Sequence, residues 1–175
     1  HMVLNSLACI IVCIYLGVNT QDIQRLFSNF KNAARRFSLK TFGDIVTIDD
    51  YAHHPTEIKV TLEAARAKYP DKKLIAVFKP NTYSRTAAFT KEFADSLKIA
   101  DKVFMTEIDC NREKQEDYPG ITSSLVLKDI PDGEIIGEDD VDKLLKYQNA
   151  VICFMSCASI SHIKDKYESL LESAK

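Results

Sequence analysis

The residues best suited to chemistry stand in one continuous run, Asp49-Asp50-Tyr51-Ala52-His53-His54-Pro55-Thr56-Glu57. Carboxylates accept hydrogen bonds from N–H and O–H groups, and an imidazole gains or loses its proton near neutral pH. Two adjacent histidines cannot both face a hydrophobic core, so at least one is expected to point into a cleft. So many functional side chains together favour a ligand-binding or catalytic site.

Two other interpretations of this run remain. In a purely structural one, Asp50 caps the turn or helix, Tyr51 packs, and His53 and His54 are solvated. In the other the histidines bind zinc, but adjacent histidines lack the spacing of ligands on one helix face, and no cysteine is nearby. We therefore predict no metal ligands in this chain.

The elements on either side position the run. Residues 44–48 are rich in β-branched side chains and predict a short buried strand. Pro55 then stands near a helix start, with Glu57 in the first turn and apolar residues at helical spacing beyond it. The run is thus a strand-to-helix turn. In open α/β sheets such turns lie at the carboxyl ends of the strands, where ligands bind.

The rest of the chain alternates strand and helix. Expected strands cover residues 73–78, 101–105, 134–136 and 150–155, and expected helices cover residues 87–99, 141–147 and 160–171. This alternation predicts an α/β fold with a mainly parallel sheet and helices on both faces. Residues 109–121, which are charged and contain Pro119-Gly120, predict an exposed loop that could reach a substrate or another domain.

Composition narrows the class of protein. The 175 residues, 46% apolar and 27% charged, fit one ordinary soluble domain with some additional chain. A net charge of −2 gives no electrostatic case for binding nucleic acid. Five cysteines, an odd number, indicate reduced thiols and a cytoplasmic location. We expect Cys9, Cys13 and Cys153 to be small core residues because they stand in apolar segments.

The most apolar segment, residues 7–18, is too short for a bilayer, which takes about 20 apolar residues. It also lacks the basic region and the small-residue cleavage site of a signal peptide. We interpret it as a buried helix of a larger domain, and we predict no membrane partner.

Two motifs resemble one enzyme family. Asp-Tyr-Ala-His-His-Pro-Thr-Glu of residues 50–57 is similar to the start of the C-terminal domain of the Mur ligases, in particular of those that attach L-alanine during peptidoglycan synthesis. Val-Phe-Lys-Pro-Asn-Thr-Tyr-Ser-Arg-Thr of residues 77–86 resembles the family's Phe-Gln-Pro-His-x-Tyr-x-Arg-Thr. Two long motifs in the right order make a chance match improbable.

Shorter segments extend the resemblance over essentially the whole chain. Residues 3–8 are similar to a family helix near the adenine pocket of the central ATP-binding domain, and Arg35-Arg36-Phe37 matches the family's Arg-Arg-Phe between domains. Residues 107–113 look like a variant of its Ile-Tyr-x-Ala-Arg-Glu loop, and residues 149–155 resemble its last strand. The resemblance implies a remnant of the central domain with the hinge over 1–38, and a Rossmann-like C-terminal domain over 39–175.

One part of the family pattern is missing. A Mur ligase holds ATP with a Gly-rich loop that ends in Lys-Ser/Thr, and no Gly-Lys-Ser/Thr occurs among these residues. We therefore expect the chain to be a fragment that does not catalyse ligation alone. ATP and Mg²⁺ would bind mainly through the absent central domain, and the missing N-terminal and central domains would be its own partners.

The resemblance also implies roles at the nucleotide. Asp50 would contact the ribose hydroxyls, with Tyr51 as a second cofactor-binding residue. Arg36 would contact the nucleotide from the hinge, and Asn5 would contact the adenine edge. The alternatives are a surface charge for Arg36 and a helix-start cap for Asn5.

Catalytic roles fall on three residues. His53 and His54 occupy the region where sister ligases place a lysine near the transferred phosphate, and an imidazolium could supply similar stabilisation. Arg85 would bind an anion, since a guanidinium suits bidentate contact with phosphate or carboxylate. The alternative for Arg85 is a surface ion pair, which contributes little.

Some residues depart from the family pattern. Ser156-Cys157-Ala158 stands where the family has Gly-Ala-Gly, Asn81 replaces a histidine, and Asp109-Cys110 replaces a tyrosine and a small residue. The absence of glycine restricts φ and the approach of backbone to a ligand.

Three functions follow from the resemblance and these departures. The first is part of an ATP-dependent ligase that joins L-alanine to UDP-N-acetylmuramate through an acyl phosphate. The second is a murein tripeptide ligase, which the segment Thr82-Tyr83-Ser84-Arg85-Thr86 argues against. The third is a non-catalytic binding module of the same fold.

Overall fold

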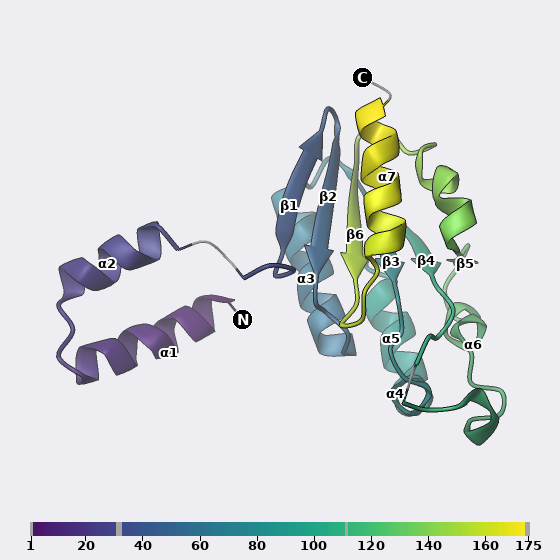
Figure 1. Ribbon diagram of the computed structural model, residues 1–175, viewed down its shortest axis with the longest axis horizontal. Helices are drawn as coiled ribbons and strands as arrows, with labels where there is room; N and C mark the ends of the chain where they lie inside the picture. Colours follow the sequence, from purple (N-terminus) through teal and green to yellow (C-terminus); the bar gives the residue numbers. More distant parts are fainter. Residues whose placement is uncertain (1, 31–32, 111, 174–175) are drawn as a thin grey trace. The chain divides into compact units, whose positions relative to one another are not determined.

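The computed structural model describes residues 2–30, 33–110 and 112–173 of the chain. It consists of two compact units, one up to Ala34 and one from Arg35 onward (Figure 1). Each unit is described by itself below.

The first unit contains two helices, α1 (Met2–Tyr15) and α2 (Thr20–Ser28). Asn19 caps α2, because its side chain accepts a hydrogen bond from the N–H of Gln21 at 2.8 Å. The segment interpreted as a helix of a larger domain is helical up to Tyr15, and its apolar residues Leu7 and Ile11 are 52% and 57% exposed here. Two helices leave one face of each without a covering layer. For the same reason Cys9 is exposed and Cys13 is partly exposed, against expectation.

The second unit is built on a six-stranded sheet in the order β1-β2-β6-β3-β4-β5. Strand β1 is antiparallel to β2, and the other neighbours are parallel. The α/β fold with a mainly parallel sheet is thereby confirmed. The strands are β1 (Ser38–Phe42), β2 (Ile45–Asp50), β3 (Lys73–Phe78), β4 (Lys102–Met105), β5 (Glu134–Ile135) and β6 (Ala150–Met155).

Helices cover both faces of the sheet (Figure 1). On one face lie α3 (Pro55–Lys68), α5 (Thr90–Leu97) and α6 (Ser123–Leu127); on the other lie α7 (Ser161–Ser173) and the 3₁₀ helix η2 (Glu138–Leu144). The short helix α4 (Tyr83–Ala88) contacts α5 beyond the ends of the strands. A second 3₁₀ turn, η1 (Gln115–Asp117), lies in the long loop after β4. The central strand β6 shows why two layers are needed, because Cys153 packs into one core and Phe154 into the other.

The sequence predictions of individual elements differ in accuracy. The strands predicted over 73–78 and 150–155 are confirmed without a shift, because fully buried strands are continuous apolar runs. Strand β1, which has three exposed residues, was not predicted. The helix predicted over 87–99 is broken at Phe89 (φ −128°) into α4 and α5. In place of the α-helix predicted over 141–147 the structure has the 3₁₀ helix η2, which begins and ends three residues earlier in the chain.

No helix within the described ranges is both long enough and apolar enough to cross a bilayer.

Candidate functional site

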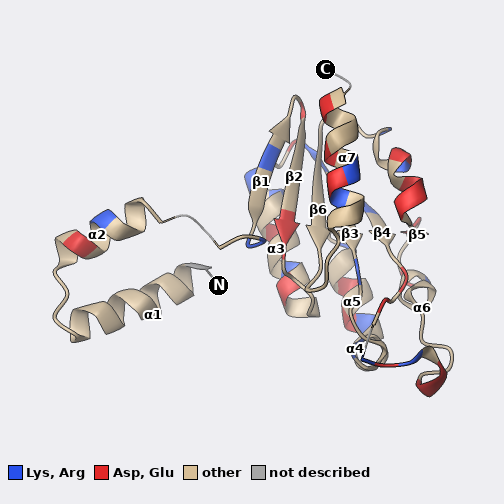
Figure 2. Ribbon diagram, in the orientation of Figure 1, with Lys and Arg blue, Asp and Glu red and all other residues tan. Residues whose placement is uncertain are grey.

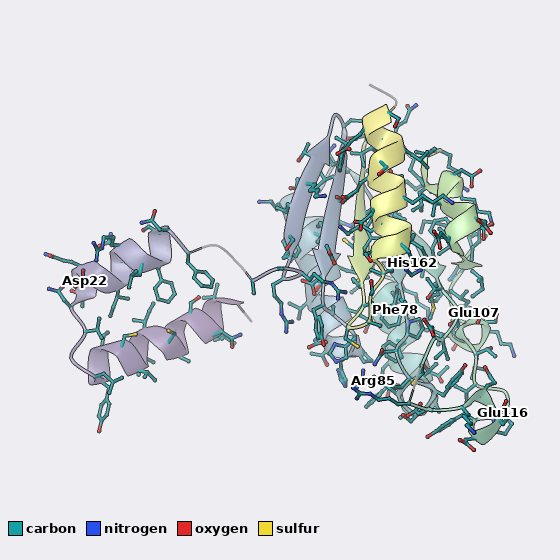
Figure 3. The ribbon with its side chains drawn as sticks, viewed as in Figure 1. Asp22, Phe78, Arg85, Glu107, Glu116 and His162 are labelled. Carbon is teal, nitrogen blue, oxygen red and sulfur yellow. The ribbon has the colours of Figure 1, made fainter. Side chains whose placement is uncertain are left out.

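The parallel strands β2, β3, β4 and β6 all end at the same side of the sheet, which we call the carboxyl edge. The loops after these strands carry Asp50 to His54, Lys79 to Arg85, Thr106 to Glu113, and Ser156 to Ala158. Arg85, Glu107 and Glu116 lie at this end of the sheet (Figure 3). Acidic and basic residues both occur along these loops (Figure 2). Four segments far apart in sequence therefore meet at one edge, the usual ligand side of such a sheet.

Asp50 holds the turn after β2. Its side chain is nearly buried, and its Oδ2 accepts the N–H of Phe37 at 2.7 Å while its Oδ1 accepts the N–H of Ala52 at 2.8 Å. Burial raises the pKa of the Asp50 carboxyl, and the two N–H donors partly oppose that rise. Both oxygens are thus engaged, as in the capping interpretation, and the predicted ribose contact of Asp50 stays a prediction.

The two histidines have different surroundings. His54 caps α3, because its Nδ1 accepts the N–H of Thr56 at 3.3 Å, and Glu57 completes a capping box by accepting the N–H groups of His53 and His54. The Nδ1 atom of His53 lies 2.9 Å from the carbonyl oxygen of Tyr51 and 3.1 Å from Oε2 of Glu57. Since both of those neighbours are acceptors, Nδ1 of His53 carries the hydrogen and Nε2 is the atom left for a ligand.

Tyr51 lies beneath the two arginines that open the second unit. The guanidinium carbons of Arg36 and Arg35 are 5.0 Å and 5.5 Å from its ring centroid, within the range of cation–π attraction. Arg35 also donates to the carbonyl oxygens of Ser156 and Ala158, and its Nε lies 3.3 Å from Oδ1 of Asp49. Residues 35–37 are therefore fastened to the turn after β2 and to the loop after β6.

Arg85 is half-buried on α4, and Thr82 caps that helix by accepting the Arg85 N–H at 3.3 Å. Its Nη1 is buried and has no hydrogen-bond partner within the described residues. The charge of Arg85 acts on the nearby Glu113 carboxyl, and the alternative of a surface ion pair for Arg85 stays open. A buried N–H usually has an acceptor, and the anion contact predicted for Arg85 stays a prediction.

Lys79 was not among the predicted site residues. It follows β3 directly, its side chain is 8% exposed, and its Nζ lies 3.0 Å from Oδ2 of Asp109. The sequence carried a signal, a lysine directly after an apolar strand, but nothing local indicated its burial. Asn111, in the same loop as Asp109, lies outside the described residues.

Asn5 belongs to the first unit. It is exposed on α1 and lines a groove of about 350 Å³ between α1 and α2, together with Cys9, Ile23 and Phe27. Its predicted contact with an adenine edge stays a prediction.

As for metals, no group of at least three His, Cys, Asp or Glu side chains among the described residues is arranged to hold an ion.

Comparisons with known proteins agree with this geometry. The family model described as "Mur ligase, glutamate ligase domain" matches residues 35–156. The UDP-N-acetylmuramate–L-alanine ligase of Levilactobacillus brevis is 46% identical over 173 residues, and that of Lactiplantibacillus plantarum is 48% identical over 174 residues. Each alignment covers 98% of this chain and 38% of the relative.

Solved structures show the same fold. The UDP-N-acetylmuramate-alanine ligase MurC from Thermotoga maritima superposes with a TM-score of 0.80 and 26% identity, covering 100% of this chain and 38% of that one. MurF ligase from Thermotoga maritima, solved in complex with ADP, superposes with a TM-score of 0.62 and 21% identity over 94% of this chain and 37% of that one. The chain thus spans only 38% to 39% of the length of the curated relatives it matches.

Proposed function

Because the chain belongs to the Mur ligase family, we propose that its full-length parent is an ATP-dependent ligase that joins L-alanine to UDP-N-acetylmuramate in peptidoglycan synthesis. The observation that carries this proposal is identity of about 45% to L-alanine ligases across 98% of the chain. The carboxyl edge supports it independently, since it gathers the Arg85 guanidinium and the available Nε2 of His53.

We propose the following division of the chain. Residues 1–38 are the end of the central ATP-binding domain with the hinge, and residues 39–175 are the C-terminal domain. The exposed apolar side chains of α1 support this division, because a helix with Val3 and Leu4 79% and 67% exposed is expected to pack against further protein. On this proposal the 175-residue chain does not catalyse ligation by itself, since the phosphate-binding loop belongs to the rest of the central domain.

The proposed chemistry makes an amide from a carboxylate. The carboxylate oxygen of UDP-N-acetylmuramate attacks the γ-phosphorus of ATP, ADP leaves, and an acyl phosphate forms. The amine of L-alanine then attacks the acyl carbon, inorganic phosphate leaves, and the amine loses a proton. Both steps concentrate negative charge, so positioned cations and the exclusion of water are what the protein contributes.

Each candidate residue has a role in this scheme. The Arg85 guanidinium binds a carboxylate or phosphate oxygen, and His53 donates or accepts through Nε2 at the reacting groups. His54 holds the start of α3 and so positions His53. Arg36 and Tyr51 form a cation–π pair and would contact the nucleotide. Mg²⁺, where bound, would neutralise phosphate charge, and we assign its ligands to the rest of the parent protein.

The test is ADP release by the full-length protein with UDP-N-acetylmuramate and Mg-ATP, with L-alanine or murein tripeptide as the second partner. We expect turnover that depends on L-alanine and falls by more than about 10-fold in His53→Ala and Arg85→Ala, since each removes a contact to a reacting charge. The matched control is His162→Ala, which alters an exposed histidine of α7. Turnover with tripeptide alone would assign the recycling activity instead, and none with either would favour the non-catalytic module.

A further inference from the structure

Lys79 combines burial with a fixed backbone at the carboxyl edge. Its N–H donates to the carbonyl oxygen of Met155 at 3.0 Å, and its own carbonyl oxygen accepts from Oγ of Ser156 at 3.0 Å. These bonds extend the β3–β6 pairing by one residue, so the sheet sets the position of the Lys79 backbone and the direction in which its side chain leaves it.

The partner of Lys79 is placed quite differently. The carboxylate of Asp109 lies on the loop after β4, and its side chain is 69% exposed, against 8% for Lys79. Among the described residues Asp109 provides the one ion pair that Lys79 forms. A buried ammonium requires an anion, because an unpaired buried charge is costly. An exposed aspartate on a loop satisfies that requirement, and another anion can take its place beside the ammonium.

The same loop also contacts the start of α4. Glu113 accepts the N–H of Ser84 at 3.0 Å, and the hydroxyl of Tyr83 donates to the carbonyl oxygen of Ile108 at 3.3 Å. Hydrogen bonds from Ser84, aided by the charge of Arg85, lower the pKa of the Glu113 carboxyl. Ile108, Asp109 and Glu113 therefore contact the segment after β3, with the Asp109 carboxylate at Lys79 and the Glu113 carboxylate at Ser84.

Lys79 and Asp109 both differ from the family motifs that the chain resembles. Lys79 stands where the family motif has glutamine, and Asp109 stands in the segment that replaces its tyrosine and small residue. Ser156, which contacts the Lys79 carbonyl, is a third departure.

We propose that Lys79 is a substrate-binding residue of the ligase, and that it binds an anionic oxygen of a substrate in exchange for Asp109. Asp109 then occupies the position of the substrate oxygen until the substrate arrives. The inference rests on the proposed function. The ligand chemistry is a carboxylate or phosphate oxygen, which L-alanine, UDP-N-acetylmuramate and ATP all carry.

The test measures the KM of each of these substrates for full-length variants. Lys79→Gln, which restores the family residue, is expected to raise the KM of one substrate by roughly 10-fold to 100-fold, the range for losing a charge-assisted hydrogen bond. Lys79→Arg is expected to restore it in large part. Asp109→Asn is expected to leave that KM unchanged or lower it, because the competing carboxylate is gone. The substrate whose KM responds identifies the source of the anion.

A purely structural ion pair predicts another pattern, in which Lys79→Gln and Asp109→Asn change the KM values alike. The matched control is Lys102→Gln, which breaks the ion pair of Lys102 and Glu134 at the opposite ends of the strands. It is expected to lower stability and leave every KM unchanged. Equal effects of the two edge variants, or KM values within about 2-fold of wild type for Lys79→Gln, would overturn the proposal.

Binding measured without turnover separates this inference from the proposed function. Calorimetric titration of wild type, Lys79→Gln and Asp109→Asn with ATP, and separately with UDP-N-acetylmuramate and L-alanine, requires no ligation. Weaker binding of one compound to Lys79→Gln but not to Asp109→Asn would support the exchange even in a protein without ligase activity. Equal binding of all three compounds by the three proteins would reject it.

Discussion

The replacement Asp50→Ala tests whether the turn after β2 is maintained by the buried carboxylate. Asp50 accepts two backbone N–H groups at 2.7 Å and 2.8 Å, and it is 6% exposed. A buried donor left without an acceptor costs about 1–3 kcal/mol. Loss of the acceptor for the buried N–H of Ala52 is expected to cost the larger part of this free energy, because water can reach the partly buried N–H of Phe37.

Two unpaired donors would give a loss of about 2–5 kcal/mol, and relief from burying a carboxylate offsets part of it. We therefore expect the free energy of unfolding to fall by roughly 2 kcal/mol in Asp50→Ala and by about half as much in Asp50→Asn, which keeps one acceptor oxygen. The control Asp71→Ala removes an exposed carboxylate and is expected to change stability by less than about 0.5 kcal/mol.

The assay is urea unfolding of the 175-residue chain followed by far-ultraviolet circular dichroism, with a shared slope for all variants. A change below about 0.5 kcal/mol in Asp50→Ala would refute the reasoning, because it would mean that the two hydrogen bonds contribute nothing net. If the full-length variant then showed only a raised KM for ATP, the carboxylate would act on the ribose and not on the turn.

Two further predictions concern carboxylates away from the edge. Glu168 accepts Thr47 Oγ1 at 2.8 Å and Lys40 Nζ at 2.6 Å. Glu168→Gln is therefore expected to lower the free energy of unfolding by about 1–3 kcal/mol in the same urea assay, with the exposed Glu172→Gln as a control that stays near wild type. For Asp101, burial raises the pKa, but hydrogen bonds from Arg66 and the Leu74 N–H outweigh it and hold the pKa below its usual 3.8. A carboxyl whose pKa is lower in the folded than in the unfolded protein adds stability at a pH above its unfolded pKa, and this stability is lost as the pH falls through its folded pKa. The difference in unfolding free energy between wild type and Asp101→Asn is therefore expected to be constant from about pH 7 to about pH 5 and to shrink below about pH 4. A difference that stays constant down to about pH 3 would contradict this.

Part of the candidate site could be predicted because its signal is local. The run from Asp49 to Glu57 has the β-branched strand, the proline and the first-turn glutamate that mark a strand-to-helix turn, and the structure has β2 and α3 on either side of it. The different hydrogen bonds of the His53 and His54 side chains could not be predicted. They depend on which nitrogen meets Glu57 or the Thr56 N–H, and that geometry exists only once α3 has formed.

The sequence by itself determined the fold class, because buried parallel strands are continuous apolar runs and amphipathic helices keep their spacing whatever they pack against. It also determined the family, through two long motifs. Only the tertiary structure decided that β6 lies between β2 and β3, and hence that residues from four loops share one edge. It alone joined Lys79 to Asp109 and Asp50 to the N–H of Phe37. Contacts between residues far apart in the chain leave no periodic pattern, since they form when packing brings separate elements together, and a polar group buried there then requires a partner.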